Sequence, residues 1–412
     1  MKNISLLAGG ICLCFLTYTA NAQVNDPNQV AKDAASNQAN NDMNNAAQNG
    51  LNKTENAIKG MFKKKNKNQQ ADTTHAKSAT APPAAGQSAP TGGGGEQILK
   101  SYANYDFVPG DKIIFASQLA DEQTGEIPSQ CTLQDGQLDI QGMDGGNVIH
   151  VPKGAGATFT PRMTSQAYLP DQFTIELDFK NERFGLAHLG VKFGESDDGI
   201  IKEIHFNDGG GVDWSTGSID FPHELEVGTD QAMTWHHIAI AVNKNVGKIY
   251  VDQYRVANVN NLAGKATSAI FIVSGYENSF IKNIRVAAGG IDIYKKVTTD
   301  AKIITHGILF DVDKSTLRPE SMGTINQICG LLKKDPALKF EIDGHTDNSG
   351  NAQHNLQLSQ QRADAVKAQL VSMGIDAARL TTRGFGDTKP IDSNSTPEGK
   401  ENNRRVEFVK TM

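Results

Sequence analysis

The sequence predicts a chain with two folded parts, an all-β sandwich or jelly roll in the middle and an α+β domain at the C-terminal end. Short alternating apolar runs, separated by Gly, Asn and Asp, fill the segment from about Tyr102 to Ala288. Strand-like and helix-like segments then alternate over the last hundred or so residues. Before both parts, residues 23–100 are rich in Asn, Gln, Ala, Pro and Gly, a composition that predicts a disordered linker.

Length and charge narrow the class of protein. The chain has 412 residues, of which 38% are hydrophobic, so it is long enough for two ordinary domains. Its formal net charge is -6, and it lacks the strong basic balance that binding to nucleic acid requires. Nucleic acid is therefore not an expected partner.

The first 22 residues have the pattern of a secretory signal peptide. Lys2 supplies a basic start, an apolar run extends from Leu6 to Leu16, and Ala20 and Ala22 form a cleavage site with small residues. Cys12 and Cys14 lack the small-residue context of a lipid-modified cysteine, so a lipoprotein is the less favoured alternative. No later apolar run reaches the roughly 18 residues of a spanning helix. We therefore expect an exported protein that is soluble or peripheral to a membrane.

The predicted linker contains one pattern of its own. Apolar residues recur loosely at helical spacing between Val30 and Phe62, and a basic run follows at residues 63–67. An amphipathic helix on anionic lipid would have this pattern, but the polar positions are mostly neutral Asn and Gln. A solvated linker is therefore the favoured interpretation.

The middle domain, residues 101–290, contains several clear strand patterns. In FTIELDF, Phe173 to Phe179, the odd-numbered residues are apolar and face inward, and the even-numbered residues are polar. HHIAIAV directs Ile238, Ile240 and Val242 inward, and NKNVGK then predicts a turn before the next strand, IYV. AIFIV and FIKNIRV continue the pattern. Many short strands without a helix-length segment favour a sandwich or jelly roll.

This order of strands, FTIELDF, WHHIAIAVNKNVGKIYVDQ and a late IKNIRV, resembles the laminin-G and concanavalin-like jelly-roll superfamily. Glu176, Asp178 and Glu182 also resemble the carboxylate signature of laminarinase-like glycoside hydrolases, which need two carboxyl groups about 5 to 5.5 Å apart. Here the last acid is one residue too far along and Lys180 interrupts the row. We interpret the row as the solvated outer face of an amphipathic strand.

Other ligands of the middle domain stay open. Binding of glycans or proteins without catalysis is compatible with this fold. Four aspartates in loop-like segments could hold calcium, although Asp is also an ordinary turn residue: Asp197, Asp198, Asp208 and Asp213.

The C-terminal domain, residues 300–412, predicts a mixed sheet with helices on one face. Four strands are expected in this domain: KIITHGILF, KFEIDGH, RLTTRGFG and RRVEFVK. Pro319 opens a first helix that continues to about Lys334, and a long second helix begins near Ala352 and ends before Gly374. Cys131 and Cys329 fall in different domains, so no disulfide framework is expected after removal of the signal peptide.

The long second helix carries an arginine where its apolar side is expected. At 100° per residue, Ala363, Val366 and Leu370 share a stripe about 100° wide, which is the usual core-facing width. Arg362, Ser359 and Asn355 lie on or beside the same stripe, nearer the helix start. The spacing alone favours a structural arginine that extends past the core edge. A cleft beneath the first helical turns is the alternative.

The last part of the chain resembles the OmpA-like peptidoglycan-binding domain over about 110 residues. The resemblance lies in five motifs that occur in the same order: FDxDxSxL, GHTDxxG, NxxLSxxR, RGFGxxxPI and NRRVEF. The resemblance implies a cleft that binds the diaminopimelate residue of the peptidoglycan stem peptide without covalent chemistry. It implies that Asp347 accepts the ligand's ammonium and that Arg362 binds a carboxylate. It also implies the remaining members of the site: Asp313, Ser349, Asn355 and Arg404. A planar guanidinium suits a carboxylate because the two can form paired hydrogen bonds.

No cofactor and no metal are expected. Asp311, Asp313 and Ser315 resemble the start of a calcium loop, but Thr316 and Met322 stand where such a loop needs glycine and glutamate. The three histidines His306, His345 and His354 show no metal-ligand spacing.

The sequence thus predicts a noncatalytic, periplasmic envelope protein that binds peptidoglycan through its last domain and associates with the outer membrane. The jelly roll would be an interaction module whose partners are outer-membrane proteins or glycans. The alternative is an envelope glycan hydrolase, or a glycan-binding protein, that uses the jelly roll and is only localised by the last domain.

Overall fold

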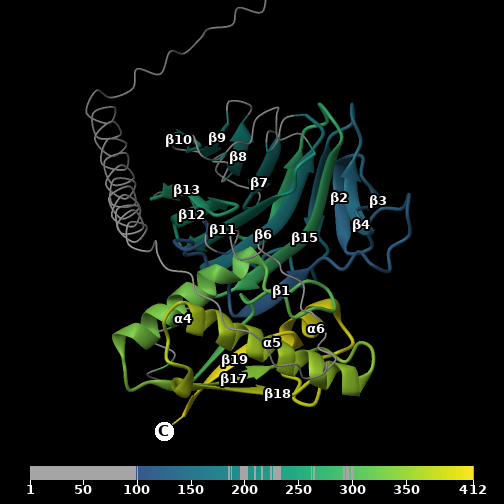
Figure 1. The fold of residues 1–412 in the computed structure, drawn as a ribbon. Coiled ribbons are helices and arrows are strands. Elements are labelled where there is room, and N and C mark those ends of the chain that lie inside the picture. Colours follow the sequence, from purple (N-terminus) through teal and green to yellow (C-terminus); the bar gives the residue numbers. More distant parts are fainter. Residues whose placement is uncertain are drawn as a thin grey trace, which may run out of the picture. The chain divides into compact units, whose positions relative to one another are not determined.

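The computed structural model describes most residues from Leu99 to Thr411 (Figure 1). The gaps are residues 100, 184–185, 187, 195–202, 208–209, 215–216, 223–224, 226–232, 261, 263–264, 291–292, 294–296 and 298–300. The described residues belong to one compact unit. The predicted signal peptide, nearly all of the predicted linker with its amphipathic segment, and Asp197, Asp198 and Asp208 lie outside the described residues.

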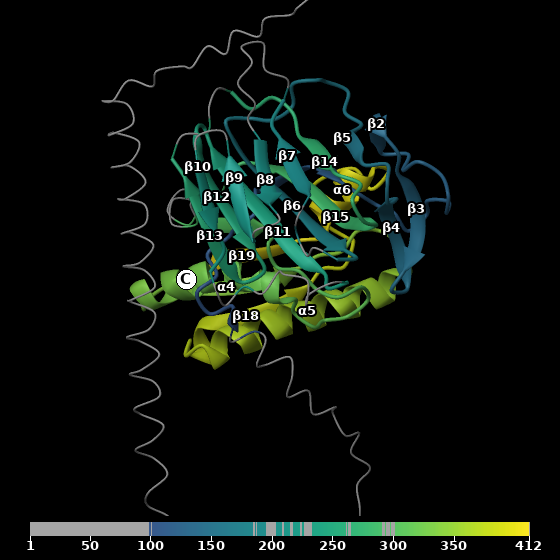
Figure 2. The same cartoon turned by 90° about the horizontal axis from the view of Figure 1, so that it is seen from above.

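Two antiparallel sheets form the first lobe, which we call the two-sheet lobe (Figures 1 and 2). In the larger sheet the order is β13-β12-β11-β6-β15-β4-β3, and β1 also pairs with β15. Its strands are β1 (Lys112–Ala116), β3 (Asp139–Met143), β4 (Gly146–Val151), β6 (Gln172–Asn181), β11 (His236–Asn243), β12 (Val246–Val251), β13 (Tyr254–Val259) and β15 (Ser279–Ala288).

The second sheet has the order β10-β9-β8-β7-β14-β5-β2. Its strands are β2 (Cys131–Gly136), β5 (Ala157–Pro161), β7 (Leu189–Lys192), β8 (Glu203–Asn207), β9 (Gly211–Trp214), β10 (Gly217–Asp220) and β14 (Ile270–Val273). Inward-facing side chains of both sheets, such as Phe179 and Ile240 from one and Phe206 and Phe271 from the other, share a single apolar core. The predicted strands at residues 173–179, 236–242 and 280–286 are therefore confirmed.

The outer face of β6 is not solvated, so our prediction for it is wrong. Glu176 is 3% exposed and Asp178 is 5% exposed. The same face of the sheet carries Ala239 and Tyr250, which join a second apolar core together with Phe107 and the C-terminal elements. The alternation correctly predicted which residues of β6 face away from the first core. A second layer of the structure covers these residues, so they are buried.

That second layer is the C-terminal lobe, residues 301–411. Its sheet has the order β16-β19-β17-β18, with β17 and β18 parallel and the other pairs antiparallel. The strands are β16 (Lys302–Thr305), β17 (Lys339–Gly344), β18 (Leu380–Gly384) and β19 (Val406–Thr411). The helices are η2 (Pro319–Ser321), α4 (Met322–Lys334), α5 (Ala352–Ser372), η3 (Ala377–Arg379) and α6 (Pro397–Asn403).

Helices α4 and α5 cover one face of this sheet, as predicted. Ile325 and Leu332 of α4 and Val366 of α5 pack with Phe340 and Phe408 of the sheet. Side chains alternate along each strand, so Glu341, Asp343 and Glu407 lie on the opposite face. The predicted mixed sheet with helices on one face is confirmed.

Two local predictions need correction. The strand expected over residues 302–310 ends at Thr305. Gly307 follows in a crowded position where an added Cβ would lie 2.3 Å from Thr324 Oγ1 and 2.7 Å from Pro109 Cδ, so the backbone packs closely there. Helix α6 was not predicted, although Thr396 caps it by accepting from Gly399 N–H and Pro397 occupies its first turn.

The described residues contain no helix that is long and apolar enough to cross a membrane. Cys131 and Cys329 are both buried and free, as expected from their positions in different parts of the chain.

Candidate functional site

A polar turn between β17 and α5 forms one wall of the candidate site. Asp347 Oδ1 accepts from Ser349 N–H at 2.7 Å, and Asn351 caps α5 by accepting from the N–H groups of Gln353 and His354. Asn355 Nδ2 donates to Ser349 O at 2.9 Å and to Asp347 O at 3.3 Å. Asn355 is 5% exposed, so the polar start of the helical stripe secures the turn from below.

Asp347 lies at the base of this turn and pairs with an arginine. The residue is 6% exposed, and its Oδ2 accepts from Arg404 Nη1, at the end of α6. Burial raises the pKa of Asp347, but the Ser349 N–H and the charge of Arg404 outweigh it, so the pKa lies below its usual value. Asp347 is therefore an anion at neutral pH.

Arg362 projects from α5 into the same region. Its Nε donates to Lys314 O at 3.0 Å, its Nη2 contacts Asp311 O at 3.5 Å, and its guanidinium lies 5.0 Å from the centre of the Phe310 ring. Within the described part of the chain no carboxylate pairs with it. Burial, and then the charge of Arg404, lower the pKa of Arg362. Arg404 already pairs with Asp347 and Glu401, so Arg362 is the guanidinium of this site that has no carboxylate partner among the described residues.

A cavity of about 100 Å³ lies beside Arg362 and Arg404. Arg362 and Arg404 line it together with residues of the β16–η2 connection, the ends of β17 and β19, and α6; these include Ile308, Leu309, Phe310, His345 and Glu401. A small anionic group fits this combination of two guanidinium groups and apolar walls.

The other predicted site residues lie farther out. Asp313 is exposed, has a φ of 57°, and its Oδ1 lies 2.5 Å from His354 Nε2. The Ser349 side chain is also exposed. The structure thus joins Asp347, Ser349, Asn355 and Arg404 by hydrogen bonds and places Arg362 beside them.

Asp313 belongs to the loop that begins at Asp311 and resembles the start of a calcium loop in sequence. In that loop the Lys314 carbonyl holds Arg362, and Asp311 pairs with Lys314 Nζ at 3.4 Å. The loop therefore serves as a rim whose backbone carbonyls contact Arg362.

Glu401 and Phe310 are site residues that the sequence analysis missed. Glu401 Oε2 accepts from Arg404 Nη2, and the two residues are three apart at the end of α6. Opposite charges three residues apart, as in Glu401 and Arg404, can indicate an ion pair, but only where the segment is recognised as a helix.

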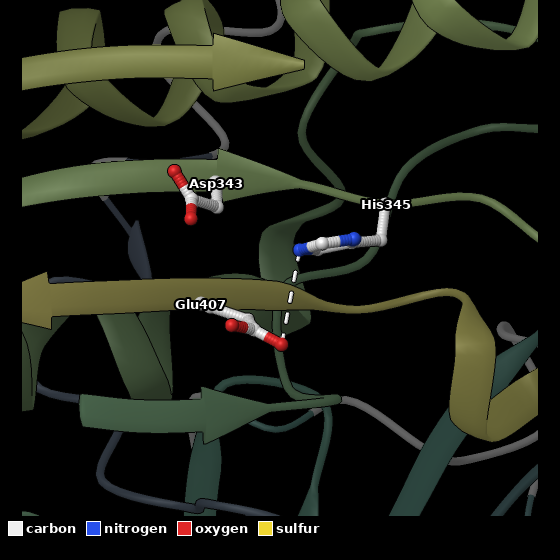
Figure 3. A group of neighbouring side chains, drawn as sticks. All are labelled: Asp343, His345 and Glu407. Atoms are coloured by element: carbon white, nitrogen blue, oxygen red, sulfur yellow. Dashed lines mark ion pairs between the residues drawn. The ribbon is translucent and has the colours of Figure 1, made fainter. Parts of the chain in front are cut away.

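Three ionisable side chains meet on the other face of the C-terminal sheet (Figure 3). Asp343, His345 and Glu407 are buried, and their ligand atoms lie within 4.8 Å of one another. This is a spacing at which a metal ion could bind, which the sequence analysis did not foresee. Glu407, however, already accepts from Arg405 Nε at 2.8 Å and Lys302 Nζ at 2.9 Å. Because two cations compensate this carboxylate, we assign no metal here.

The carboxylates of the two-sheet lobe are engaged with other side chains. Arg285 holds Glu176 by two hydrogen bonds of 2.9 and 2.8 Å. Asp178 accepts from Asn283 at 2.6 Å and lies 2.8 Å from His237 Nδ1. Burial raises the pKa of Asp178, but His237 and Arg318 lower it to about 2. The exposed Glu182 accepts from Asn278 instead.

Such a group does not suit glycoside hydrolysis. That reaction needs one carboxylic acid with a raised pKa opposite a second, available carboxylate.

Asp213, one of the suggested calcium ligands, accepts from Asn207 Nδ2 at 3.0 Å. The described residues therefore give no support to either alternative for this lobe.

Residues 309–404 match the model of the OmpA family. Three similar proteins are the probable lipoprotein YiaD of Escherichia coli (43% identical over 104 residues), outer membrane protein A of Bordetella avium (43% over 109) and peptidoglycan-binding protein ArfA of Mycobacterium tuberculosis (41% over 102). These matches cover 25%, 26% and 25% of this chain and 48%, 56% and 31% of the three relatives. The chain thus spans less than two thirds of each relative.

The C-terminal lobe therefore contains an OmpA-family domain, and the predicted resemblance of this part of the chain is confirmed. The candidate site residues Asp347, Arg362 and Arg404 lie within the matched segment, and the cavity lining also includes residues just outside it, such as Ile308. The match does not extend into the two-sheet lobe.

Proposed function

We propose that the OmpA-family domain binds the stem peptide of peptidoglycan noncovalently, through the zwitterionic end of a diaminopimelate residue. The protein would be exported to the periplasm and would link the wall to the outer membrane. The name of the relative ArfA states peptidoglycan binding, and the name of the Bordetella relative states an outer-membrane protein. Both names support the proposal for this domain.

The observation that carries the proposal is the unpaired charge of Arg362. A half-buried guanidinium with no carboxylate partner among the described residues, beside a second arginine, costs free energy unless an anion faces it. A ligand carboxylate in the cavity between Arg362 and Arg404 would remove that cost. The same ligand would present its ammonium to Asp347, whose charged partner among the described residues is Arg404, an arginine that Glu401 shares.

The charges of the proposed ligand are complementary to those of the site, and the expected affinity suits attachment to a polymer. A zwitterionic amino acid end needs one anion and one cation held at fixed separation, and α5 and the turn before it provide both. Each charged hydrogen bond contributes about 1.5 to 3 kcal/mol net, so a single stem peptide is expected to bind modestly. The repeating wall polymer would then provide firm attachment through its high effective concentration.

Asp313, Ser349 and Asn355 would complete the site in different ways. Asn355 holds the turn that carries Asp347. Asp313 and the Ser349 hydroxyl lie at its exposed rim, where they can reach the more distant parts of a stem peptide. The two-sheet lobe would be an interaction module of jelly-roll type, and its partners would be outer-membrane proteins or glycans.

A pull-down with purified sacculi tests the proposal. The full chain, Asp347→Ala and Arg362→Ala are compared for the fraction that sediments with the wall. Both variants should lose most of the binding. Arg383→Ala is the matched control, since Arg383 is an exposed arginine that lies over Phe385 and does not line the cavity. Undiminished binding by both site variants would contradict the proposal.

A further inference from the structure

Helix α6, which ends at Arg404, is attached to the two-sheet lobe. Asn402 is 4% exposed, and its amide pairs with the backbone of Ile113 in β1. Ile113 N–H donates to Asn402 Oδ1 at 2.9 Å, and Asn402 Nδ2 donates to Ile113 O at 3.0 Å. This arrangement imitates a pair of strand hydrogen bonds, so the first strand of one lobe fixes the helix of the other.

Arg285 of β15 reaches across the same boundary. Its Nε and Nη2 bind Glu176, its Nη1 donates to His306 O at 3.1 Å, and its Nη1 lies 3.8 Å from Glu401 Oε1. Arg285 is 7% exposed and Glu176 is 3% exposed. A buried arginine held by a bidentate carboxylate has a fixed position, because its planar group is locked in two directions.

The ion pairs continue from there into the candidate site. Glu401 accepts from Arg404 Nη2, and Arg404 Nη1 donates to Asp347. Along the series Glu176, Arg285, Glu401, Arg404 and Asp347 the sign of the charge alternates at every step. The first two residues belong to the two-sheet lobe and the last three to the OmpA-family domain.

We propose that Arg285 is a positioning residue for the wall-binding site, which acts by holding Glu401 and through it the guanidinium of Arg404. This inference rests on the proposed function. It makes the two-sheet lobe a structural part of the binding site, in addition to any partner it has elsewhere. The Arg404 side chain is 35% exposed, so packing alone does not fix it, and it depends on Glu401 and Asp347 for its orientation.

A double-mutant cycle distinguishes positioning from a general loss of structure. Binding of a soluble muropeptide that contains diaminopimelate is measured by calorimetry for the full chain, Arg285→Met, Arg404→Ala and the double variant. Arg285→Met should weaken binding about tenfold, the equivalent of one charged hydrogen bond. In the Arg404→Ala background the same change should have no further effect, because contacting groups that act through one another are not additive.

Conservative variants add a second measurement. Arg285→Lys keeps the charge beside Glu401 but loses the bidentate geometry, so it should recover only part of the affinity. Glu401→Gln removes the intermediate charge and should reproduce the loss seen in Arg285→Met. Because Glu401 is partly exposed, this variant tests the inference even where Arg285→Met fails to fold.

The outcomes separate the two proposals. If Asp347→Ala binds the muropeptide as the unmodified chain does, the proposed function is wrong. If Asp347→Ala loses binding while Arg285→Met and Glu401→Gln keep it, only the positioning role is wrong. An equal loss from Arg285→Met in both Arg404 backgrounds would also overturn the positioning role, since it would indicate an effect that does not pass through Arg404.

Discussion

Two arginines of this protein, Arg285 at the boundary of the lobes and Arg362 in the OmpA-family domain, differ in burial and in their partners: Arg285 is buried and Arg362 is half-buried. Arg285 has a bidentate carboxylate in Glu176, whereas the partners of Arg362 within the described part of the chain are backbone carbonyls and the Phe310 ring. A buried charge with a partner holds structure, and one without a partner is available to a ligand. The difference separates the structural region from the candidate binding region.

The largest expected effect concerns the paired arginine. Glu176→Ala leaves Arg285 buried without its bidentate partner and should lower the free energy of unfolding by about 3 to 5 kcal/mol. Urea denaturation measures the change. Glu182→Ala is the control, since Glu182 is exposed, and it should change stability by less than about 0.5 kcal/mol. A similarly small change for Glu176→Ala would mean that the Glu176–Arg285 pair has no structural role.

The unpaired arginine should show the opposite behaviour. Arg362→Met should weaken muropeptide binding about 10- to 100-fold, and it should change the free energy of unfolding by less than about 1 kcal/mol, because it also removes repulsion from Arg404.

Arg379→Met is the matched control for this variant, since Arg379 also donates to carbonyls, those of Leu332, Asp335 and Leu338 at 2.7 to 3.0 Å. It should lose stability and keep binding. Calorimetry and denaturation of both variants together decide the comparison, and a destabilised Arg362→Met with normal binding would reverse our assignment.

The buried cluster of Asp343 and His345 provides a pH test (Figure 3). Burial, and then Arg405, lower the pKa of His345 to about 4, so its contribution to stability is present above about pH 6.5 and is lost as the pH falls towards 4. Burial, and then Glu341 and Glu407, raise the pKa of Asp343 to about 6, so its protonation favours the folded state as the pH falls from 6 towards about 3.9. The two contributions oppose each other.

Asp343→Asn should therefore reveal the histidine alone. Its stability should fall more steeply than that of the unmodified chain between pH 6 and pH 4. Urea denaturation at several pH values in this range measures both slopes. Identical slopes would show that the two groups do not titrate as their burial implies.

The smallest effect is expected at the rim. Asp313 is exposed and contacts His354, so Asp313→Ala should leave stability within about 0.5 kcal/mol and weaken muropeptide binding only a few-fold. Calorimetry resolves this difference. A loss as large as that of Arg362→Met would place Asp313 at the centre of the site instead of its edge.

Local patterns in the sequence predicted the elements well where one face of a strand or helix meets one core. The long helix α5 begins and ends where Asn351 and Gly374 indicate, and Asn355, Ser359 and Arg362 lie on the predicted side. The ordered motifs from Phe310 to Arg404 indicated the OmpA-like domain, and residues 309–404 match the model of that family. The roles of Asp347 and Arg404 in binding stay predictions.

Long-range packing was not predictable in the same way. The alternation in β6 shows which residues face away from the first core, but it cannot show that a second lobe covers Glu176 and Asp178. Helix α6 has only 7 residues, too few for a periodic pattern, and its partner Ile113 is 289 positions from Asn402. A contact of that separation leaves no local signal.

The amide of Asn402 has a further consequence for strand β1. Among the described strands β1 pairs with β15 alone, so its other side is an edge that would offer free N–H and C=O groups to another chain. Asn402 occupies both groups of Ile113. A fragment that contained the two-sheet lobe without α6 would expose that edge, and the OmpA-family domain therefore protects its neighbour against edge-to-edge aggregation.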